Sequence, residues 1–390
     1  MTFEPEPINA EALLHYFADK RGEILSLVRA LCEVESPSGD GEGSAAVVQL
    51  LAEAAKSVSP GAAVERVAAP DGYGEHFILR AFHGPEEEKS LLLLGHTDTV
   101  HPRGTLAARP WREEGGRIYA PGVYDMKAAV ALALYSIRAC ADGWFGPRRP
   151  VVLLLTCDEE SGSFSGRGLV EREASRAEYV LVLEPPAPGG RAKTARKGTG
   201  LFTLAVEGRA AHAGLEPEKG VNAVLEIARQ IERVSALARP ELGTTLNVGT
   251  VSGGTHANVV PAEARAEIDV RFSTTSEARR VEEAIRGLES FDGRARLRVS
   301  GGINRPPMER TAAVAALFEK ARRAAASLDI ELGEASVGGA SDGNFAAACG
   351  ATVLDGLGID GDGAHAEHEH ILADAVARRG AFLTALVAGL

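Results

Sequence analysis

The chain has 390 residues, enough for two or three domains, and its 45% hydrophobic and 25% charged residues are ordinary for a globular protein. Its 42 Lys and Arg against 54 Asp and Glu give a net charge of −12, which argues against a nucleic-acid-binding surface or a polybasic membrane patch. The apolar runs are far shorter than the ~20 residues of a membrane helix, and the N-terminus does not resemble a signal peptide. We therefore expect a cytoplasmic protein without nucleic-acid or membrane partners.

The four cysteines are widely scattered and form no CxxC pair; they are Cys32, Cys140, Cys157 and Cys349. This spacing predicts free, buried thiols in a reducing compartment and argues against a cysteine-ligated zinc site.

The first half of the chain alternates between helix-like and strand-like segments. Apolar residues at helical spacing predict helices at 44–57 and 126–141, and short apolar runs predict buried strands at 91–94, 151–156 and 179–183. This order is typical of an α/β domain with a mostly parallel sheet and helices on both of its faces.

The pattern changes near residue 197. The residues that follow predict two helices and four strands in the order β-α-β-β-α-β, which is typical of a ferredoxin-like α+β unit. In chain order these elements are 199–206, 221–238, 244–251, 261–272, 276–288 and 295–300. Residues 261–272 alternate between apolar and charged side chains, as expected for an antiparallel sheet with one wet face.

The first pattern then returns. We interpret residues 301–307 (GGINRPP) as the return hinge, followed by a helix at 310–328, a strand near 351–354 and a final helix from about residue 372. We therefore predict an α/β domain made of residues 1–196 and 307–390, interrupted by an inserted domain of residues 197–306.

Histidines and acidic residues gather just after the predicted strands or at the start of a helix, in five separate segments. They are His96 with Asp98, Asp125, Glu159 with Glu160, Glu184, and His365. Each alone could be a helix cap or a turn residue, but ligands of an open α/β sheet bind at the carboxyl ends of its strands. Five such segments together predict a metal site.

The residue types in this set narrow the choice of metal. Imidazole and carboxylate ligands without thiolate suit zinc, with cobalt or manganese as substitutes. Two histidines and at least three carboxylates exceed the needs of one tetrahedral zinc. The set fits a two-metal centre with a bridging carboxylate and a water nucleophile.

These segments resemble a known family. GHTDTV, PGVYDMKAA, CDEESGS, VLEPP and GAHAEHEHI resemble the five metal-site motifs of the M20 family of dizinc aminoacylases and carboxypeptidases, and GRAAHAG, HANVVPAEA and DVRF resemble its inserted domain. DTVHPRGT and INRPP are most similar to the glutamate carboxypeptidase branch. The resemblance implies a zinc-peptidase catalytic domain interrupted by a ferredoxin-like dimerisation or lid domain.

The resemblance also implies residue roles at the metal centre. Asp125 would bridge two zinc ions per chain, His96 and Glu184 would complete one site, and Glu160 and His365 would complete the other. Asp98 would orient the His96 ring, and Glu159 would be the general base. The peptide bond between Asp125 and Met126 would be cis.

The inserted domain receives two further roles from the resemblance. Residues 197–306 would form a homodimer, and His212 would stabilise the oxyanion in the partner's active site. Asn258, Arg271 and Arg305 would hold the terminal carboxylate of the substrate, for which guanidinium groups are well suited.

Several remaining residues are not assigned to the chemistry. His76 stands where relatives commonly carry asparagine, and its role is open, as is that of His256. We interpret Glu369 as a supporting residue beside His365, and His368 and His370 as solvated.

The predicted activity is zinc-dependent hydrolysis of an amide bond next to a free carboxylate. We favour a metallo-carboxypeptidase that releases a C-terminal amino acid, with glutamate as one candidate, from peptides or N-acyl conjugates. The alternative is an N-acyl amino acid deacylase of the acetylornithine or succinyl-diaminopimelate type, and the remote alternative is an inactive binding protein of the same fold.

Overall fold

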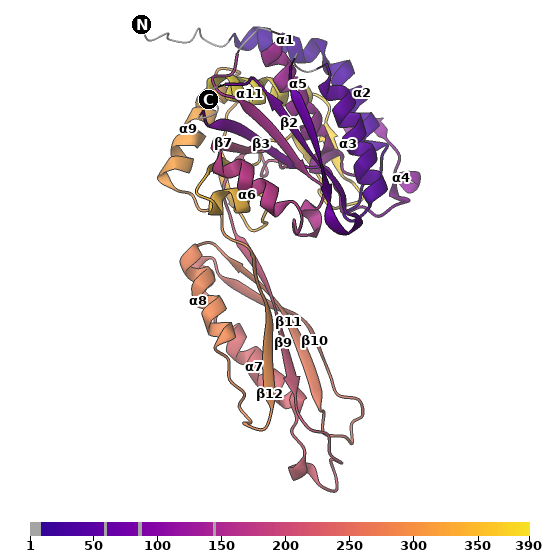
Figure 1. Cartoon of the computed structure of the whole chain (residues 1–390), viewed down its shortest axis with the longest axis vertical. Coiled ribbons are helices and arrows are strands. Elements are labelled where there is room, and N and C mark those ends of the chain that lie inside the picture. The colour runs from indigo at the N-terminus through magenta and orange to yellow at the C-terminus, as the bar shows by residue number, and fades with distance from the viewer. Residues whose placement is uncertain (1–8, 58–60, 85–87, 143–145) are drawn as a thin grey trace. The chain divides into compact units, whose positions relative to one another are not determined.

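A computed structural model describes residues 9–57, 61–84, 88–142 and 146–390 of the chain (Figure 1). The chain folds into two compact units. Unit 1 comprises Met1–Thr194, Arg310–Ser336 and Ser341–Leu390, and unit 2 comprises Ala195–Glu309 and Val337–Ala340. Within the described ranges, no helix has the length and apolar character needed to cross a membrane.

Unit 1 is built on a six-stranded sheet. In spatial order its strands are β1 (Ala63–Ala69), β2 (Gly74–Ala81), β6 (Val151–Thr156), β3 (Ser90–His96), β7 (Ala177–Val182) and β14 (Thr352–Leu354). The strands from β6 to β14 are parallel, whereas β2 is antiparallel to both of its neighbours. The predicted mostly parallel sheet is therefore confirmed, and an antiparallel hairpin of β1 and β2 is added at one edge.

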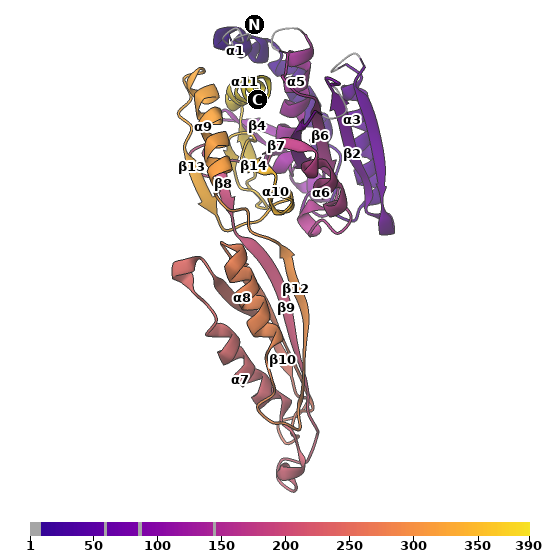
Figure 2. The same cartoon turned by 60° about the vertical axis from the view of Figure 1, so that its left-hand side comes forward.

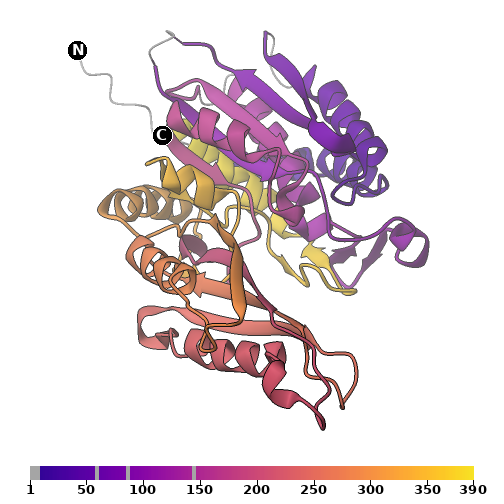
Figure 3. The ribbon, with the colours of Figure 1, turned by 60° about the horizontal axis from the view of Figure 1, so that its bottom comes forward.

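Helices cover both faces of this sheet, and every residue of β3 and of β6 is therefore buried. The longer helices are α1 (Ala10–Asp19), α2 (Arg21–Cys32), α3 (Gly41–Ala55), α5 (Ala128–Ala141), α6 (Arg167–Ser175), α9 (Ala312–Ala326) and α11 (Ala375–Gly389). The C-terminal helix α11, yellow in Figure 3, packs against α1, α5 and α9. The shorter helices are α4 (Thr105–Ala108) and α10 (Gly343–Ala348).

Two smaller sheets accompany the six-stranded sheet. β15 (Gly361–Asp362), β16 (His370–Leu372), β5 (Arg117–Tyr119) and β4 (Arg112–Glu114) form one sheet, and β13 (Glu334–Val337) pairs with β8 (Ala192–Arg196). The first of these sheets brings the segment after His365 beside the segment that leads to Asp125.

One predicted helix begins later than expected. Residues Val123–Lys127 form a wide turn in which Asp125 and Met126 have non-helical backbone angles, so α5 begins at Ala128 rather than at 126. The Asp125 side chain is therefore carried by a turn and not by a regular helix.

Unit 2 has the expected ferredoxin-like order. Its elements are β9 (Gly198–Glu207), α7 (Ala223–Ser235), β10 (Thr245–Gly253), β11 (Glu263–Phe272), α8 (Thr275–Arg286) and β12 (Arg296–Arg305). The strands form an antiparallel sheet in the order β10-β11-β9-β12. Figures 1 and 2 show both helices on the same face of this sheet, where the apolar residues of β11 pack.

The predicted hinge at 301–307 is wrong for its first five residues. Gly301 pairs with Phe202 of β9 and Gly302 with Leu201, and β12 continues to Arg305. Gly301 fits this strand because it has a φ of +84° and because a Cβ here would lie 2.1 Å from the Leu201 carbonyl oxygen. Two glycines in the sequence thus marked a close backbone approach within a strand rather than the end of one.

The packing of α11 against α1 requires a residue without a side chain at Gly380, and this requirement can be tested. A Cβ on Gly380 would lie 2.3 Å from the ring of Phe17, which is fully buried. We expect Gly380→Ala to lower the free energy of unfolding by about 1–3 kcal/mol through overpacking, despite the higher helix propensity of alanine. Chemical denaturation of both proteins measures this change.

Gly168→Ala in α6 is the matched control, because a Cβ there has no neighbour within 4 Å. This control variant should be at least as stable as the parent. Equal stability of Gly380→Ala and the parent would show that α1 does not pack on α11 as described.

Candidate metal centre

The parallel strands bring three predicted segments to one edge of the main sheet. His96 is the last residue of β3, Glu159 and Glu160 follow the end of β6, and Glu184 follows the end of β7. Because β3 pairs in parallel with both β6 and β7, these three carboxyl ends lie side by side.

The first group of candidate ligands consists of His96, Asp125 and Glu184, all buried, with candidate ligand atoms within 4.8 Å of one another. The His96 Nε2 atom lies 3.2 Å from Asp125 Oδ1 and 3.6 Å from Glu184 Oε1. The other ring nitrogen, Nδ1, donates to the carbonyl oxygen of Asp98 over 2.9 Å. A proton held on Nδ1 leaves Nε2 as the nitrogen available to a metal.

The second group consists of Asp125, Glu160 and His365. The His365 Nε2 atom lies 3.1 Å from Glu160 Oε1 and 3.5 Å from Asp125 Oδ2. Asp125 thus presents Oδ1 to one group and Oδ2 to the other. The peptide bond between Asp125 and Met126 is cis, as the resemblance implied.

Charges in the two groups are strongly coupled. Hydrogen bonds to Asp125 and Glu160 raise the pKa of His365 to about 10. Burial opposes charge on His96 and on Asp125, but their hydrogen bonds outweigh it, so the pKa of His96 is raised well above its usual value and that of Asp125 is lowered. Burial raises the pKa of Glu160. Without a metal, the two imidazoles therefore supply the positive charge that the carboxylates need.

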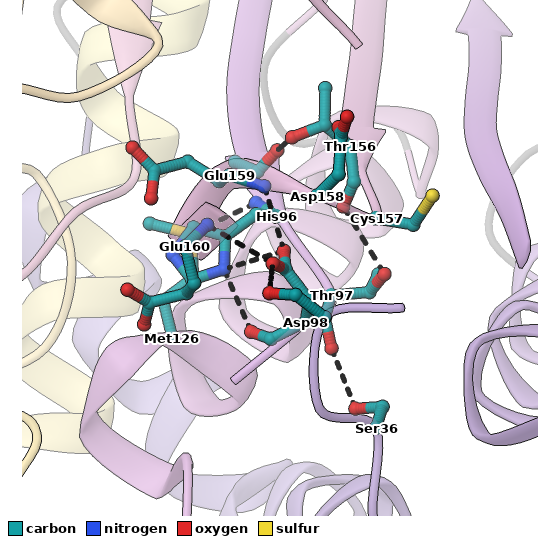
Figure 4. A network of polar contacts seen from close by, with 12 residues as sticks. Ser36, His96, Thr97, Asp98, Met126, Thr156, Cys157, Asp158, Glu159 and Glu160 are labelled. Atoms are coloured by element: carbon teal, nitrogen blue, oxygen red, sulfur yellow. Dashed lines mark hydrogen bonds and ion pairs between the residues drawn. The ribbon is translucent and has the colours of Figure 1, made fainter. Parts of the chain in front are cut away.

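Asp98 lies between His96 and the segment of Glu159 and Glu160 (Figure 4). Its Oδ1 and Oδ2 accept hydrogen bonds from the backbone amides of Glu159 (3.1 Å) and Glu160 (3.0 Å), and Oδ1 lies 3.5 Å from His96 Nδ1. Ser38 donates a further hydrogen bond to Oδ2. The predicted orienting role of Asp98 is thus joined by a second one, which is to fix the backbone that carries Glu159 and Glu160.

The carboxylates of Glu159 and Glu160 point to the same side in Figure 4. Glu159 is 7% exposed, and its side chain is not part of either group of candidate ligands. This position leaves Glu159 available for the role of base that the resemblance implied.

A third group of possible ligands, His76, Cys157 and Asp158, is held together by hydrogen bonds. His76 Nδ1 accepts from the Cys157 amide (3.2 Å), its Nε2 lies 3.1 Å from Ser165 Oγ, and Ser165 Oγ donates to Asp158 (2.8 Å). Burial lowers the pKa of His76. We read this group as a hydrogen-bond network that supports the segment before Glu159.

The structure also tests the expectations for the histidines after His365, for Cys349 and for Glu369. His370 is 7% exposed in β16, so the prediction that it is solvated is wrong, whereas His368 is exposed. Cys349 is exposed and not buried as expected, although all four cysteines are unpaired. Glu369 is buried and hydrogen-bonded to the turn that carries Asp125.

The four remaining predicted site residues lie in unit 2. His212 and Asn258 are exposed and lie in adjacent segments, because His212 pairs with Val259 and the Ala213 amide donates to the Asn258 carbonyl. Arg271 and Arg305 pair with Thr199 from opposite sides. Paired residues share a face of a sheet, so the two arginines lie in one row.

The unit 2 residues differ in their surroundings. Arg271 forms a bidentate ion pair with Asp269, with Nε and Nη2 at 2.8 and 2.9 Å from its two oxygens. Arg305 is buried. His256, whose role was left open, is exposed in a turn.

Comparisons with known proteins agree with the motifs. The model of peptidase family M20/M25/M40 matches residues 92–389. Carboxypeptidase G2 from Pseudomonas sp. is 29% identical over 371 residues, which cover 93% of this chain and 88% of that protein. A succinyl-diaminopimelate desuccinylase from Delftia acidovorans is 27% identical, with 89% and 93% covered.

Solved structures show the same fold. An aminopeptidase PepT from Bacillus cereus matches with a TM-score of 0.78 at 23% identity and covers 95% of this chain and 98% of that one. An M20 family metallo-carboxypeptidase from Sulfolobus solfataricus matches with a TM-score of 0.70 at 18% identity, with 94% and 98% covered. Since the family model spans most of the sequence, the chain belongs to peptidase family M20/M25/M40, a family of metal-dependent hydrolases.

Proposed function

We propose that the protein is a dizinc carboxypeptidase that hydrolyses the amide bond next to a free carboxylate and releases a C-terminal amino acid, with glutamate as the first candidate. The observation that carries the proposal is the placement of Asp125. Its two oxygens face His96 on one side and His365 on the other, as a carboxylate that bridges two ions requires.

The residues present fit two divalent ions. Each group offers one imidazole nitrogen and two carboxylates, counting Asp125 in both, and no thiolate, a donor set that suits zinc and also cobalt or manganese. The like charges of Asp125, Glu160 and Glu184 would be neutralised by the ions in place of protons on His96 and His365.

The chemistry would be divided between the ions and the protein. Bound ions would supply Lewis acidity for the attack of water on the amide carbonyl. Glu159 would accept the proton of that water and deliver it to the leaving amine. Asp98 would keep Glu159 and Glu160 in place through their amides.

Unit 2 would supply substrate recognition and the dimer. Asn258, Arg271 and Arg305 would bind the terminal carboxylate, and residues 197–306 would pair with a second copy so that His212 donates to the oxyanion in the partner's site. The domain division at 197 and 306 is part of this proposal. The unpaired cysteines are compatible with the cytoplasm as its compartment.

N-acyl amino acid deacylation is the second candidate. Relatives support it, because an acetylornithine deacetylase from Myxococcus xanthus is 30% identical over 240 residues, covering 55% of this chain and 60% of that protein, and the Delftia acidovorans relative is a desuccinylase. Both reactions use the same attack on an amide, and they differ in which side of the bond is recognised.

A substrate panel with a metal determination tests the proposal. Purified, unchelated protein should contain about two zinc ions per chain, and N-acyl glutamates should be hydrolysed in preference to N-acyl derivatives of neutral and basic amino acids. Sensitivity to the acyl group without sensitivity to the released residue would favour the deacylase. Protein that binds neither zinc nor cobalt and hydrolyses nothing would support the inactive binding protein.

The assignment of Glu159 makes a separate prediction. Glu159→Ala should lower kcat by about 10²–10⁴-fold because the proton acceptor is lost, while the zinc content stays at the parent value because Glu159 is not in either ligand group. Atomic absorption and steady-state kinetics measure the two quantities. An active Glu159→Ala enzyme would refute the assignment.

The same variant tests the trans role of His212. Inactive Glu159→Ala and His212→Ala proteins, mixed under conditions of subunit exchange, should regain part of the activity, because a hybrid dimer would contain one intact site. Absence of any recovery, with exchange demonstrated by differently tagged subunits, would contradict the trans arrangement.

The charges at the centre predict proton release on metal binding. In metal-free protein the neighbouring carboxylates favour the imidazolium form of both histidines, which has a second ring proton, since the pKa of His365 is about 10 and that of His96 is raised. Zinc must displace this second proton from both, so binding should release about two protons per chain, and affinity should rise as the pH increases toward 10. Titration calorimetry at pH 7 in buffers of different ionisation enthalpy measures this number. Release of none would contradict the described pairing.

A further inference from the structure

Glu369 is a buried carboxylate that belongs to neither ligand group. It is 3% exposed and accepts four hydrogen bonds. Its Oε1 accepts from the amides of Tyr124 (2.9 Å) and Asp125 (3.1 Å), and its Oε2 accepts from the Gly122 amide (2.8 Å) and from His101 Nε2 (2.6 Å). Burial of a carboxylate at this depth is tolerated because four donors surround it.

Two of these donors, Tyr124 and Asp125, belong to the turn that carries Asp125, and a third, Gly122, immediately precedes it. Residues Val123–Lys127 are not regular helix, and the amides of Tyr124 and Asp125 in this turn have Glu369 as their acceptor. Glu369 also lies four residues after His365 in the sequence. One side chain therefore joins the turn of Asp125 to the loop of His365, and these two residues face each other across the second ligand group.

The fourth donor extends the connection to the loop of His96. His101 lies five residues after His96, and its Nδ1 is 3.2 Å from Arg109 Nη2. A guanidinium can only donate, so Nδ1 must accept and the ring proton lies on Nε2, where it is donated to Glu369. Arg109 Nη1 also donates to the Ala366 carbonyl (3.3 Å), directly beside His365.

The loop of His365 needs such support. His365 has a φ of +64°, a left-handed conformation that is unfavourable for a residue with a side chain. It is fixed on its C-terminal side by Arg109 at Ala366 and by Glu369. A glutamine in place of Glu369 would turn an amide nitrogen toward N–H donors and would lose part of this network.

We propose that Glu369 is a positioning residue that, together with His101, sets the separation of Asp125 and His365 and thereby the metal affinity of the second ligand group. The proposal rests on the proposed function, because it assumes that both groups bind ions. It assigns to Glu369 and His101 a role distinct from ligation and from contact with the substrate.

The test compares metal binding by Glu369→Gln and by the parent protein. Metal-free protein is titrated with Co²⁺, and both the affinity and the visible absorption spectrum are recorded, since the spectrum reports ligand geometry independently of activity. We expect Glu369→Gln to lose about 10–100-fold in affinity for at least one ion, with a changed spectrum, and to lower kcat more than it changes KM.

Glu367→Gln is the matched control, because Glu367 is exposed on the same loop and the substitution removes the same charge. Its affinity and spectrum should equal those of the parent. His101→Gln, which can still donate from the position of Nε2, should bind Co²⁺ more tightly than His101→Leu, which cannot.

The outcomes separate the two proposals. A folded Glu369→Gln protein with the affinity and spectrum of the parent would overturn the positioning role. If Glu369→Gln does not fold, the His101 pair decides, and identical parent-like binding by both variants would overturn it. A parent protein that binds no Co²⁺ would refute the proposed function itself.

Discussion

Asp98, Asp125, Glu184 and Glu369 are each less than a tenth exposed and gather at or beside one edge of the main sheet. A buried carboxylate is tolerated only if donors or positive charges replace the water it has lost. The structure meets this requirement in two ways. Asp98 and Glu369 are surrounded mainly by backbone amides, whereas Asp125 and Glu184 face imidazoles. Whether a carboxylate faces backbone amides or imidazoles indicates which of two roles it has.

A backbone amide cannot lose its proton at neutral pH. A carboxylate that accepts hydrogen bonds from backbone amides therefore fixes the position of the chain. An imidazolium is a replaceable partner, because it can lose its proton and coordinate an ion instead. Asp98 and Glu369 therefore hold the loops. Under the proposed function, His96 and His365 would give up protons and Asp125 would then face metal ions in place of imidazolium groups. Each of these two carboxylates fixes a segment that carries a candidate site residue. Asp98 fixes the segment of Glu160, and Glu369 fixes the segment of Asp125.

The residues that face each other at the centre could be predicted because their signals are local. His96 and Glu184 follow apolar strands whose parallel order predicts that they meet at one edge, whereas the role of Asp125 beside them came from the resemblance of its motif to the family. The contact between His101 and Glu369 spans 268 residues, and Glu369 also accepts hydrogen bonds from the amides of a non-helical turn. No periodicity records such a turn, and the same turn shifted the start of α5 to Ala128.

Unit 2 shows the same limit. Its strand and helix order followed from alternation, but Gly301 and Gly302 suggested a hinge and are in fact part of β12. In isolation a glycine pair indicates freedom of the backbone, and only the neighbouring strand β9 shows that it is needed for close approach. The ion pair between Arg271 and Asp269 could not be predicted from the sequence either. The two residues are two positions apart on the same strand, and whether they pair depends on their rotamers.

That ion pair bears on specificity. Peptidase and deacylase chemistry share the attack on the amide, so the centre around Asp125 cannot by itself decide between them, and the groups that bind the free carboxylate must. Arg271 already uses Nε and Nη2 on Asp269. If Arg271 binds the substrate as proposed, the substrate carboxylate would have to use the remaining N–H groups of Arg271 or displace Asp269. The first arrangement would orient the guanidinium plane, because Asp269 as a bidentate partner on one edge fixes the direction of the other edge. Asp269 would thus limit which substrates place their carboxylate correctly, although it touches none of the reacting atoms.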